Sequence, residues 1–456
     1  MSDRDCERCL VRHRRRLRPR HTGAGLKIRY FKAFCLWIVA GLWLPLFVRP
    51  IGAALSEHTA SSSRVQSPFV DAGAYIYISG QNARKSDGSL PTTFQEQVAQ
   101  SLENLQSVIK SAGLTLEHVV YVQVYLEDTG KYDLLNEAFK ARFGQFQPAR
   151  AALGVYRNPN SPVQINAVAV RSLEGKKSIF LPNFDSQSST PAGMLTADRL
   201  FISSMPGSDP ATGKIPDDPA LQVDLALDRL KAVLKAADLD LGNMVFVNPY
   251  LTKEIPMRVM NERYARRFEF GNTPARATIE VTSLPDGAHI EYTGVAVRDL
   301  TQRKAVRPKN MPPSPTASPC VFAGDTLYCS AKDGFIPGPH GGLYATTTPH
   351  QLRQTMRNQL DNLEQADMRF DQVVSTNVYL DDISDTPAFD DVYAQYFGSP
   401  LPARSTVQQI APTERKADEQ DHFPGLEQVS LIAVDRRASA RMSGDGVPSC
   451  LTIFAP

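Results

Sequence analysis

The sequence predicts an α+β protein made of three tandem copies of one module, each a mixed sheet with two helices. A Pro-Ala-Arg tripeptide recurs with its arginines at Arg150, Arg276 and Arg404, and the two intervals are nearly equal. Each copy follows a segment of helical periodicity and opens an apolar, β-prone run. A Tyr-Leu pair recurs at a matching place in each copy: Tyr125-Leu126, Tyr250-Leu251 and Tyr379-Leu380. Self-similarity at a fixed period indicates a repeated structural unit.

The first copy shows the order of elements. Residues 74–80 alternate, which predicts a strand with Ile76 and Ile78 on one face and Tyr75, Tyr77 and Ser79 on the other. Apolar residues at helical spacing predict a helix over Thr93–Ala112, ended by Gly113. A strand is expected at Val119–Leu126, with Val120, Val122, Val124 and Leu126 on one side. A helix is expected at Tyr132–Phe143, and two further strands are expected at Ala151–Tyr156 and Val163–Val170.

The other two copies repeat this ββαβαββ order. Their main strands and second helices are expected at Leu200–Ser203, Met244–Leu251, Asn261–Phe268 and Ile290–Val297, and then at Leu327–Ser330, Val373–Leu380, Phe389–Phe397 and Val429–Val434. Two helices are too few to cover both faces of a sheet, so one face of each sheet must be buried against another layer. We expect the open faces to pack on one another around a pseudo-threefold axis. The chain is then a monomer, an intramolecular pseudo-trimer.

These elements divide the chain into six parts. They are a basic tail with a targeting segment at 1–55, a tether at 56–66, module 1 at 67–171, module 2 at 190–299, module 3 at 318–437 and a tail at 438–456. Module 3 carries an extra loop at about 413–425. The linker Arg303–Pro319 is rich in proline, which predicts an extended and semi-rigid segment.

The N-terminal region predicts export or membrane anchoring. Residues 1–32 hold eleven Lys and Arg against three acidic residues, and the sixteen residues 33–48 carry no charge. A basic region, a short apolar core and the small residues 52–54 indicate a secretory signal peptide. An uncleaved anchor and a buried soluble helix are the alternatives. With a signal peptide or an uncleaved anchor, the body lies outside the cytoplasm, as a periplasmic, secreted or anchored protein. The remaining chain is mildly acidic, which argues against a nucleic-acid groove.

The six cysteines do not form a metal-binding pattern. Cys6 and Cys9 have zinc or redox spacing, but no second pair accompanies them. Cys329 lies in an apolar run and is interpreted as a small core residue. Cys320 and Cys450 are candidates for a disulfide in an oxidising compartment, a question that the sequence leaves open.

The module resembles the RidA/YjgF family, of the "endoribonuclease L-PSP" type. The motifs that carry this resemblance are Ser79-Gly80-Gln81, Glu103-Asn104-Leu105, Asn136, Pro148-Ala149-Arg150 and Val168-Ala169-Val170. The family consists of small homotrimers with a chorismate-mutase-like fold. The resemblance therefore implies three RidA-like modules in one chain, a covalent version of such a trimer.

The resemblance implies hydrolysis of reactive enamines and imines to keto acids and ammonia, in clefts between neighbouring modules and without a cofactor or metal. The arginine that grips the substrate carboxylate falls on Arg150, Arg276 and Arg404, and a guanidinium fork matches a carboxylate bidentately. The alternative is that these arginines form structural ion pairs. The cleft serine falls on Ser79, Ser203 and Ser330, where the alternative is a small residue near a sheet end. The helix asparagine falls on Asn136 and Asn261, with Asp390 in module 3.

The last strand departs from the family pattern. The glutamate that activates water in active members aligns with Asn166, Thr293 and Ser430, none of which is a general base near neutral pH. Glu291 lies two residues before Thr293 and is the candidate catalytic residue; its counterparts are Gln164 and Gln428.

Three functions follow as hypotheses. The first is a divergent RidA-like deaminase that acts on a small anionic metabolite. The second is a non-catalytic protein that binds small carboxylates in the same clefts. The third is a ribonuclease, which the acidic body makes the least favoured.

Overall fold

The computed structural model describes residues 66–182, 190–338, 341–418 and 422–436. All of them belong to one compact unit, Ser62–Pro456. The expected targeting segment, the tether up to residue 65 and the tail from residue 438 lie outside the described residues. No helix among the described residues is long and apolar enough to cross a membrane.

Module 1 has the predicted ββαβαββ order. Its elements are β1 (Phe69–Asp71), β2 (Tyr75–Asn82), α1 (Phe94–Ser111), β3 (Val119–Leu126), α2 (Tyr132–Phe143), β4 (Ala149–Gly154) and β5 (Val163–Val170). The sheet order is β1-β2-β5-β3-β4, and β3 and β4 pair in parallel while the other pairs are antiparallel. The helix predicted at Thr93–Ala112 is confirmed. Thr93 forms a capping box with Glu96, and Gly113 follows the last turn at a φ of 76°.

Module 2 repeats the arrangement with additional edge strands. Its elements are β6 (Lys177–Ile179), β7 (Gly193–Leu195), β8 (Arg199–Pro206), α3 (Pro219–Ala236), β9 (Met244–Leu251), α4 (Met257–Ala265), β10 (Ala275–Arg276), β11 (Ile279–Glu280) and β12 (Ile290–Val297). The sheet order is β10-β9-β12-β8-β7-β6, and β11 also pairs with β9. Strand β6 comes from the segment between the first two modules. The segment expected as part of a helix at Asn261–Phe268 is helical only to Ala265.

Module 3 contains β13 (Arg303–Val306), β14 (Cys320–Ala323), β15 (Thr326–Asp333), α5 (Thr348–Gln365), β16 (Val373–Leu380), α6 (Thr386–Tyr393), β17 (Ala403–Gln408) and β18 (Glu427–Val434). The sheet order is β13-β14-β15-β18-β16-β17. The linker predicted as extended begins with β13, which pairs with β14 and so extends this sheet. The helix expected at Phe389–Phe397 begins earlier and ends at Tyr393.

Two sequence interpretations are wrong in detail. Val120 packs in a different core cluster from Val122, because the register of β3 against β5 shifts between Val119 and Tyr121 and reverses the alternation. Cys329 is not a free core thiol. It forms a disulfide with Cys320, since β14 and β15 place the two residues opposite each other with Cα atoms 4.1 Å apart.

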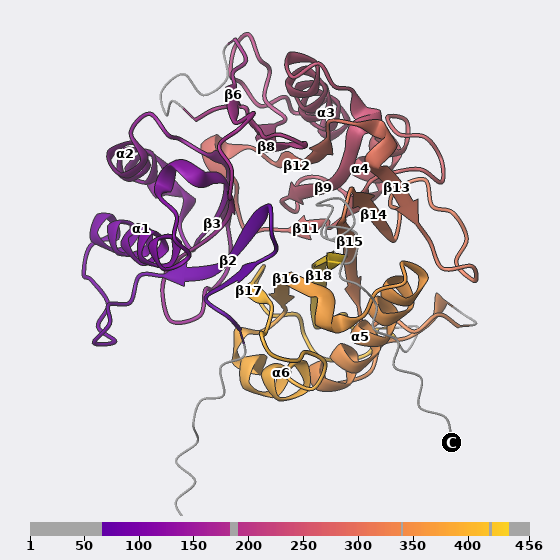
Figure 1. The fold of residues 1–456 in the computed structure, drawn as a ribbon. Helices are drawn as coiled ribbons and strands as arrows, with labels where there is room; N and C mark the ends of the chain where they lie inside the picture. Colours follow the sequence, from indigo (N-terminus) through magenta and orange to yellow (C-terminus); the bar gives the residue numbers. More distant parts are fainter. Residues whose placement is uncertain (1–65, 183–189, 339–340, 419–421, 437–456) are drawn as a thin grey trace, which may run out of the picture. The chain divides into compact units, whose positions relative to one another are not determined.

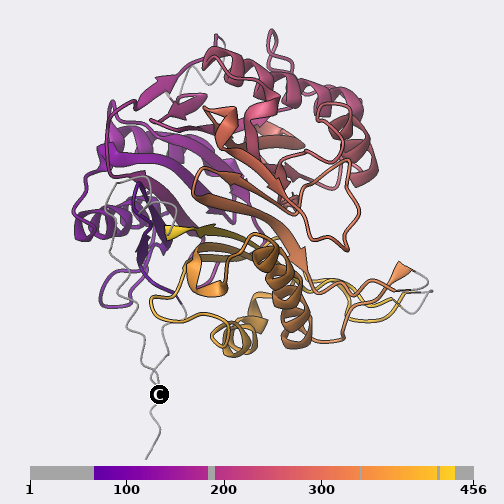
Figure 2. The same ribbon diagram turned by 45° about the vertical axis from the view of Figure 1, so that its right-hand side comes forward.

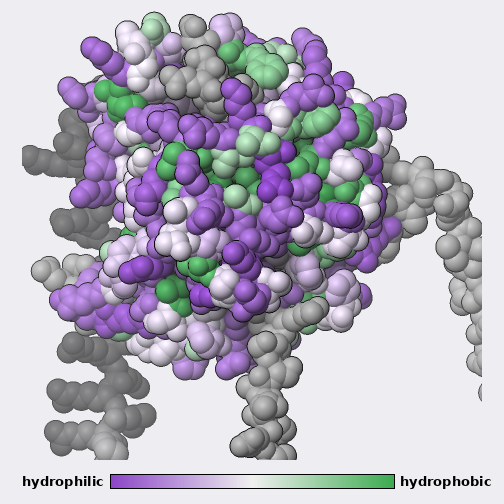
Figure 3. Space-filling view, turned by 90° about the vertical axis from the view of Figure 1, so that its left-hand side faces the viewer, coloured by the Kyte–Doolittle hydropathy of each residue, from purple (hydrophilic) through white to green (hydrophobic). Residues whose placement is uncertain are grey.

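Each sheet has its helices on one face and a shared core on the other. In Figure 1 the helices α1 to α6 lie on the outside, while the strands converge at the centre, and Figure 2 shows the same sheets from a second angle. The shared core draws on all three modules, with members such as Tyr77, Phe201 and Tyr328. The contacts run in a ring, β4 with β8, β10 with β15 and β17 with β2. On the face shown in Figure 3, hydrophobic residues are scattered in small groups among hydrophilic ones.

Candidate active site

One hydrogen bond recurs at all three junctions between modules. The backbone N–H of each Pro-Ala-Arg arginine donates to a serine hydroxyl of a neighbouring module, and that hydroxyl donates to a backbone carbonyl. The N–H to Oγ distances are 2.9 Å for Arg150 and Ser203, 2.8 Å for Arg276 and Ser330, and 2.9 Å for Arg404 and Ser79. The hydroxyls donate to Pro191, Ser318 and Ser67 respectively. The three serines therefore join modules, and they place each arginine at a junction.

The junction of modules 1 and 2 contains a cleft, which we call the first cleft, of about 450 Å³. Module 1 contributes Arg150 from β4 and Asn136 from α2, and module 2 contributes Ser203 from β8 and Glu291 from β12. Three of the predicted binding residues and the predicted catalytic residue thus line one cleft.

Arg150 lines this cleft, and no carboxylate of the described residues forms a salt bridge with it. Its Nη2 donates to the Tyr132 hydroxyl at 3.2 Å and to the Asn136 side-chain oxygen. Its guanidinium lies over the Phe139 ring, 4.7 Å from the centroid. The residue is 4% exposed, and its Nη1 has no hydrogen-bond partner among the described residues. A buried cation with a free N–H is a site for an anionic oxygen.

Glu291 supplies an ionisable group to the same cleft. It is 4% exposed, and its Oε2 has no hydrogen-bond partner in the part of the chain that is described. Burial, with a smaller contribution from Asp286, raises the pKa of the Glu291 carboxyl to about 8, while Ser204 and Arg229 oppose the rise. Glu291 is therefore mostly protonated at pH 7, as a carboxylic acid that can donate a proton.

Two of the residues that align with the glutamate of the family lie away from the first cleft. Asn166 and Thr293 line a central cavity between the three sheets, where Asn166 donates to the Ser405 hydroxyl at 2.8 Å and Thr293 donates to Ile202 O. Residues two apart on a strand share a face but lie about 6–7 Å apart along it. The spacing of two residues on β12 therefore places Thr293 in the central cavity and Glu291 in the first cleft. Ser430 is buried in β18.

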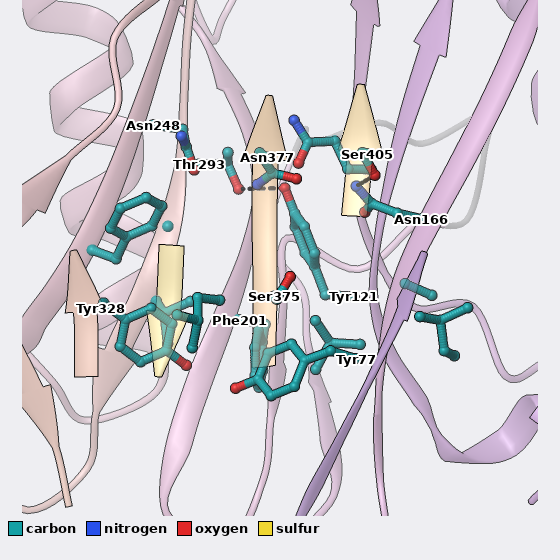
Figure 4. A pocket seen from close by; sticks show the side chains of 18 of the residues that line it. Tyr77, Tyr121, Asn166, Phe201, Asn248, Thr293, Tyr328, Ser375, Asn377 and Ser405 are labelled. Atoms are coloured by element: carbon teal, nitrogen blue, oxygen red, sulfur yellow. Dashed lines mark hydrogen bonds between the residues drawn. The ribbon is translucent and has the colours of Figure 1, made fainter. Parts of the chain in front are cut away.

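The central cavity is small, about 70 Å³. Figure 4 shows aromatic and amide side chains pointing into it, and Tyr121 and Thr293 are joined there by a hydrogen bond of 3.3 Å. It has room for a few water molecules.

The junction of modules 2 and 3 holds a second cleft, of about 540 Å³. Arg276 donates to the Asn261 side-chain oxygen at 2.8 Å and lies over Tyr264, 5.2 Å from the ring centroid. Gln428 occupies the position that corresponds to Glu291, and residues 311–315 of the proline-rich linker form a wall. This cleft keeps the arginine clamp, but no described residue that lines it is a carboxylate.

The junction of modules 3 and 1 is closed by its own side chains. Arg404 forms a salt bridge of 2.7 Å with Asp390, and the arginine side chain is 4% exposed. Gln164, the counterpart of Glu291, donates to Thr406 O at 3.1 Å. Gly80 packs against it so closely that a Cβ there would lie 2.1 Å from Gln164 Oε1. For Arg404 the ion-pair interpretation therefore holds.

Sequence reasoning did not single out Tyr132, Ser204 or Arg229, which also line the first cleft. Ser204 directly follows Ser203, the recurring serine of module 2, and this adjacency could have pointed to it. Arg229 is visible only when the first helices of the three modules are superimposed. No group of three or more potential metal ligands occurs among the described residues.

Comparison with protein families gives one match, repeated three times. The family model described as "Endoribonuclease L-PSP" matches residues 58–171, 189–298 and 310–413. The matches cover more than half of the chain.

Curated relatives match single modules. A "RutC family protein" of Aquifex aeolicus is 36% identical over 109 residues, which are 23% of this chain and 87% of the relative. The Escherichia coli K12 protein named "Putative reactive intermediate deaminase TdcF" is 32% identical over 108 residues, 23% of this chain and 84% of the relative. The crystal structure of E. coli TdcF with bound serine is 31% identical, with a TM-score of 0.22, and the match covers 23% of this chain and 86% of that structure.

Proposed function

This chain belongs to the RidA/YjgF family, the "Endoribonuclease L-PSP" family of the matching model, and from that premise we propose that its first cleft hydrolyses enamines or imines of amino acids to keto acids and ammonia. One observation carries the proposal. The guanidinium of Arg150 from module 1 and the buried carboxyl of Glu291 from module 2 line the same cleft, and each has a polar atom without a hydrogen-bond partner among the described residues.

Arg150 binds the substrate carboxylate. Neutral oxygens of Tyr132 and Asn136 hold the guanidinium in place, so its positive charge remains available to the ligand. A charge-assisted hydrogen bond of this kind contributes about 1.5–3 kcal/mol. The bound carboxylate fixes the C=N or C=C–N group inside the cleft.

Glu291 moves the protons. It donates its proton to the enamine β-carbon, or to the imine nitrogen, and an iminium forms. The Glu291 carboxylate then takes a proton from water as the water oxygen bonds to the iminium carbon. Glu291 returns this proton to the nitrogen, the C–N bond breaks and ammonia leaves, while the new hydroxyl gives its proton to Glu291. Enamine and water thus become keto acid and ammonia, and the carboxyl ends protonated.

The three junctions differ in this scheme. The second cleft binds small carboxylates through Arg276, but Gln428 cannot move a proton as Glu291 does. At the third junction Asp390 occupies the arginine. Each chain therefore has one hydrolytic site. As a monomer it contains the three modules that a trimer of single-module subunits would bring together. A molar mass of three chains by light scattering would contradict the monomer.

The N-terminal segment completes the proposal. Residues 33–48 export the body or anchor it outside the cytoplasm. Cell fractionation of the tagged chain should place it in the periplasm, the medium or the membrane, and recovery in the cytosolic fraction alone would overturn this part.

The hydrolytic function is tested with 2-iminobutyrate, generated by an amino-acid oxidase from 2-aminobutyrate. The purified protein should accelerate 2-oxobutyrate release over buffer, and Arg150→Ala should lose about 10- to 100-fold in kcat/KM. Arg142→Ala is the matched control, because this arginine of the same module pairs with Glu103 outside the cleft. If the wild-type protein binds 2-oxobutyrate through Arg150 but gives no acceleration, the chain is a carboxylate-binding protein and not a hydrolase.

A further inference from the structure

The first cleft contains a second arginine, which replaces an asparagine of the other modules. The helices α1, α3 and α5 each have 18 residues, and Arg229 is the eleventh of α3. The eleventh residues of α1 and α5 are Asn104 and Asn358. Asn104 donates to the backbone carbonyls of Asn82 and Arg84 at 2.8 and 2.9 Å. Asn358 donates to those of Asp333 and Phe335 at 3.1 and 3.2 Å. In both modules this position holds the loop after the strand.

Arg229 does not hold its loop in this way. Within the described part of the chain it makes no hydrogen bond or salt bridge, and it lines the first cleft half-buried, together with Arg150 and Glu291. Burial lowers the pKa of the Arg229 guanidinium, and the carboxyls of Asp209 and Glu291 oppose this shift. The guanidinium is therefore an available cation on the module 2 side of the cleft.

The Asp209 carboxylate attracts Arg229 electrostatically, but no salt bridge or hydrogen bond joins the two residues in the part of the chain that is described. The Asp209 Oδ1 accepts hydrogen bonds from the N–H groups of Ala211 and Thr212 at 2.9 and 2.8 Å, so its carboxylate closes the loop at residues 209–213. Glu291 is mostly protonated at pH 7. Two guanidinium groups, one from each module, therefore line one cleft of about 450 Å³, which Asp133 and Asp286 also line.

We propose that the first cleft selects a substrate with two carboxylates, the imine or enamine of a dicarboxylic amino acid, with Arg150 binding one carboxylate and Arg229 the other. This proposal rests on the proposed hydrolytic function and names its substrate class. Specificity follows from charge, because a monocarboxylate leaves the half-buried Arg229 cation without its anion.

The test measures binding of stable keto acids by calorimetry, so that it does not depend on turnover. Arg276→Ala serves as the background, because it removes binding in the second cleft. In this background 2-oxoglutarate or oxaloacetate should bind at least about tenfold more tightly than 2-oxobutyrate. Arg229→Asn, which installs the residue of the other two modules, should abolish that preference and leave 2-oxobutyrate affinity within about twofold. Arg258→Asn is the control, because Arg258 pairs with Glu262 on the surface.

The outcomes separate this inference from the proposed function. Equal affinity for mono- and dicarboxylates in the background protein, or an equal loss for both in Arg229→Asn, overturns the dicarboxylate inference even when 2-iminobutyrate is hydrolysed. A dicarboxylate preference that depends on Arg229, without hydrolysis of 2-iminobutyrate or 2-iminoglutarate, overturns the hydrolytic function and leaves the binding specificity in place. Thermal unfolding of each variant checks that the fold is intact.

Discussion

The backbone N–H of Arg150 donates a hydrogen bond to the Ser203 hydroxyl across 2.9 Å, so the residue proposed to bind the substrate carboxylate also joins module 1 to module 2. Arg276 with Ser330 and Arg404 with Ser79 repeat this relationship. In a protein whose sites lie between modules, the geometry of each site depends on the joint that forms it. The serine is present at all three junctions, although the partners of the arginine side chains differ.

Replacing the joining serine should lower stability at each of the junctions, but it should change activity only at the first cleft. Ser203→Ala leaves the buried Arg150 N–H without an acceptor, which costs about 1–3 kcal/mol, and it should raise KM for 2-iminobutyrate by loosening the clamp. Ser79→Ala is the matched control, with a similar stability cost at the third junction and an unchanged KM. Urea unfolding and steady-state kinetics measure both effects. An equal rise of KM in the two variants would contradict this local coupling.

The sequence was sufficient for the elements that follow a regular period. Val163–Val170 and Tyr132–Phe143 were expected with the bounds observed, because strand alternation and the glycine after the helix are local signals. Val120 was misplaced because a β-bulge changes the phase of alternation without a mark in the sequence.

The site was predicted less completely, because its members come from different modules. The arginine positions were found by their repetition, and the serine and asparagine positions by the resemblance to the family. Thr293 was aligned with the glutamate of the family and Glu291 was the candidate catalytic residue. Both lie on one strand face, and only the packing of the sheets decides that Glu291 lines the first cleft and Thr293 the central cavity. Arg229 escaped notice because nothing in a single helix distinguishes a cleft arginine from a surface one.

The pH dependence of hydrolysis should follow Glu291. The protonated form prevails below its pKa of about 8 and starts the reaction, so kcat/KM should fall as pH rises through about 8. Glu291→Gln, which installs the residue found at Gln164 and Gln428, should lower kcat/KM by about 100-fold or more and abolish this limb of the profile. Initial rates from pH 6 to 9.5 measure it. If the fall of kcat/KM above pH 8 persists in Glu291→Gln, it reflects the titration of the substrate and not of Glu291.

The third junction should respond differently to two changes of one residue. Asp390→Ala leaves the buried Arg404 cation unpaired and should cost about 3 kcal/mol of unfolding free energy. Asp390→Asn restores the arginine–asparagine contact of Asn136 and Asn261, so its cost should be clearly smaller. Chemical denaturation of both variants tests this. Equal costs would show that Arg404 gains nothing from an amide oxygen.

A second buried glutamate, Glu427, should weaken the fold as pH rises. It begins β18, is 4% exposed and accepts a hydrogen bond from the Thr355 hydroxyl, while its Oε2 has no partner among the described residues. Burial raises the pKa of the Glu427 carboxyl to about 8; Asp333 also raises it, and Thr355 opposes the rise.

The sign of the effect follows from proton linkage. The unfolded chain loses the Glu427 proton near its usual pKa of 4.5, whereas the folded chain keeps it up to about pH 8. Between these values the unfolded state binds fewer protons, so the free energy of unfolding falls as pH rises. Glu427→Gln should remove this loss and stabilise the protein by on the order of 3 kcal/mol at pH 8 relative to its effect at pH 4.5. Surface Glu364→Gln is the control and should change stability by less than about 0.5 kcal/mol at either pH. Urea unfolding at both pH values decides the matter, and a gain of equal size at pH 4.5 and 8 would mean that Glu427 does not retain its proton in the folded chain.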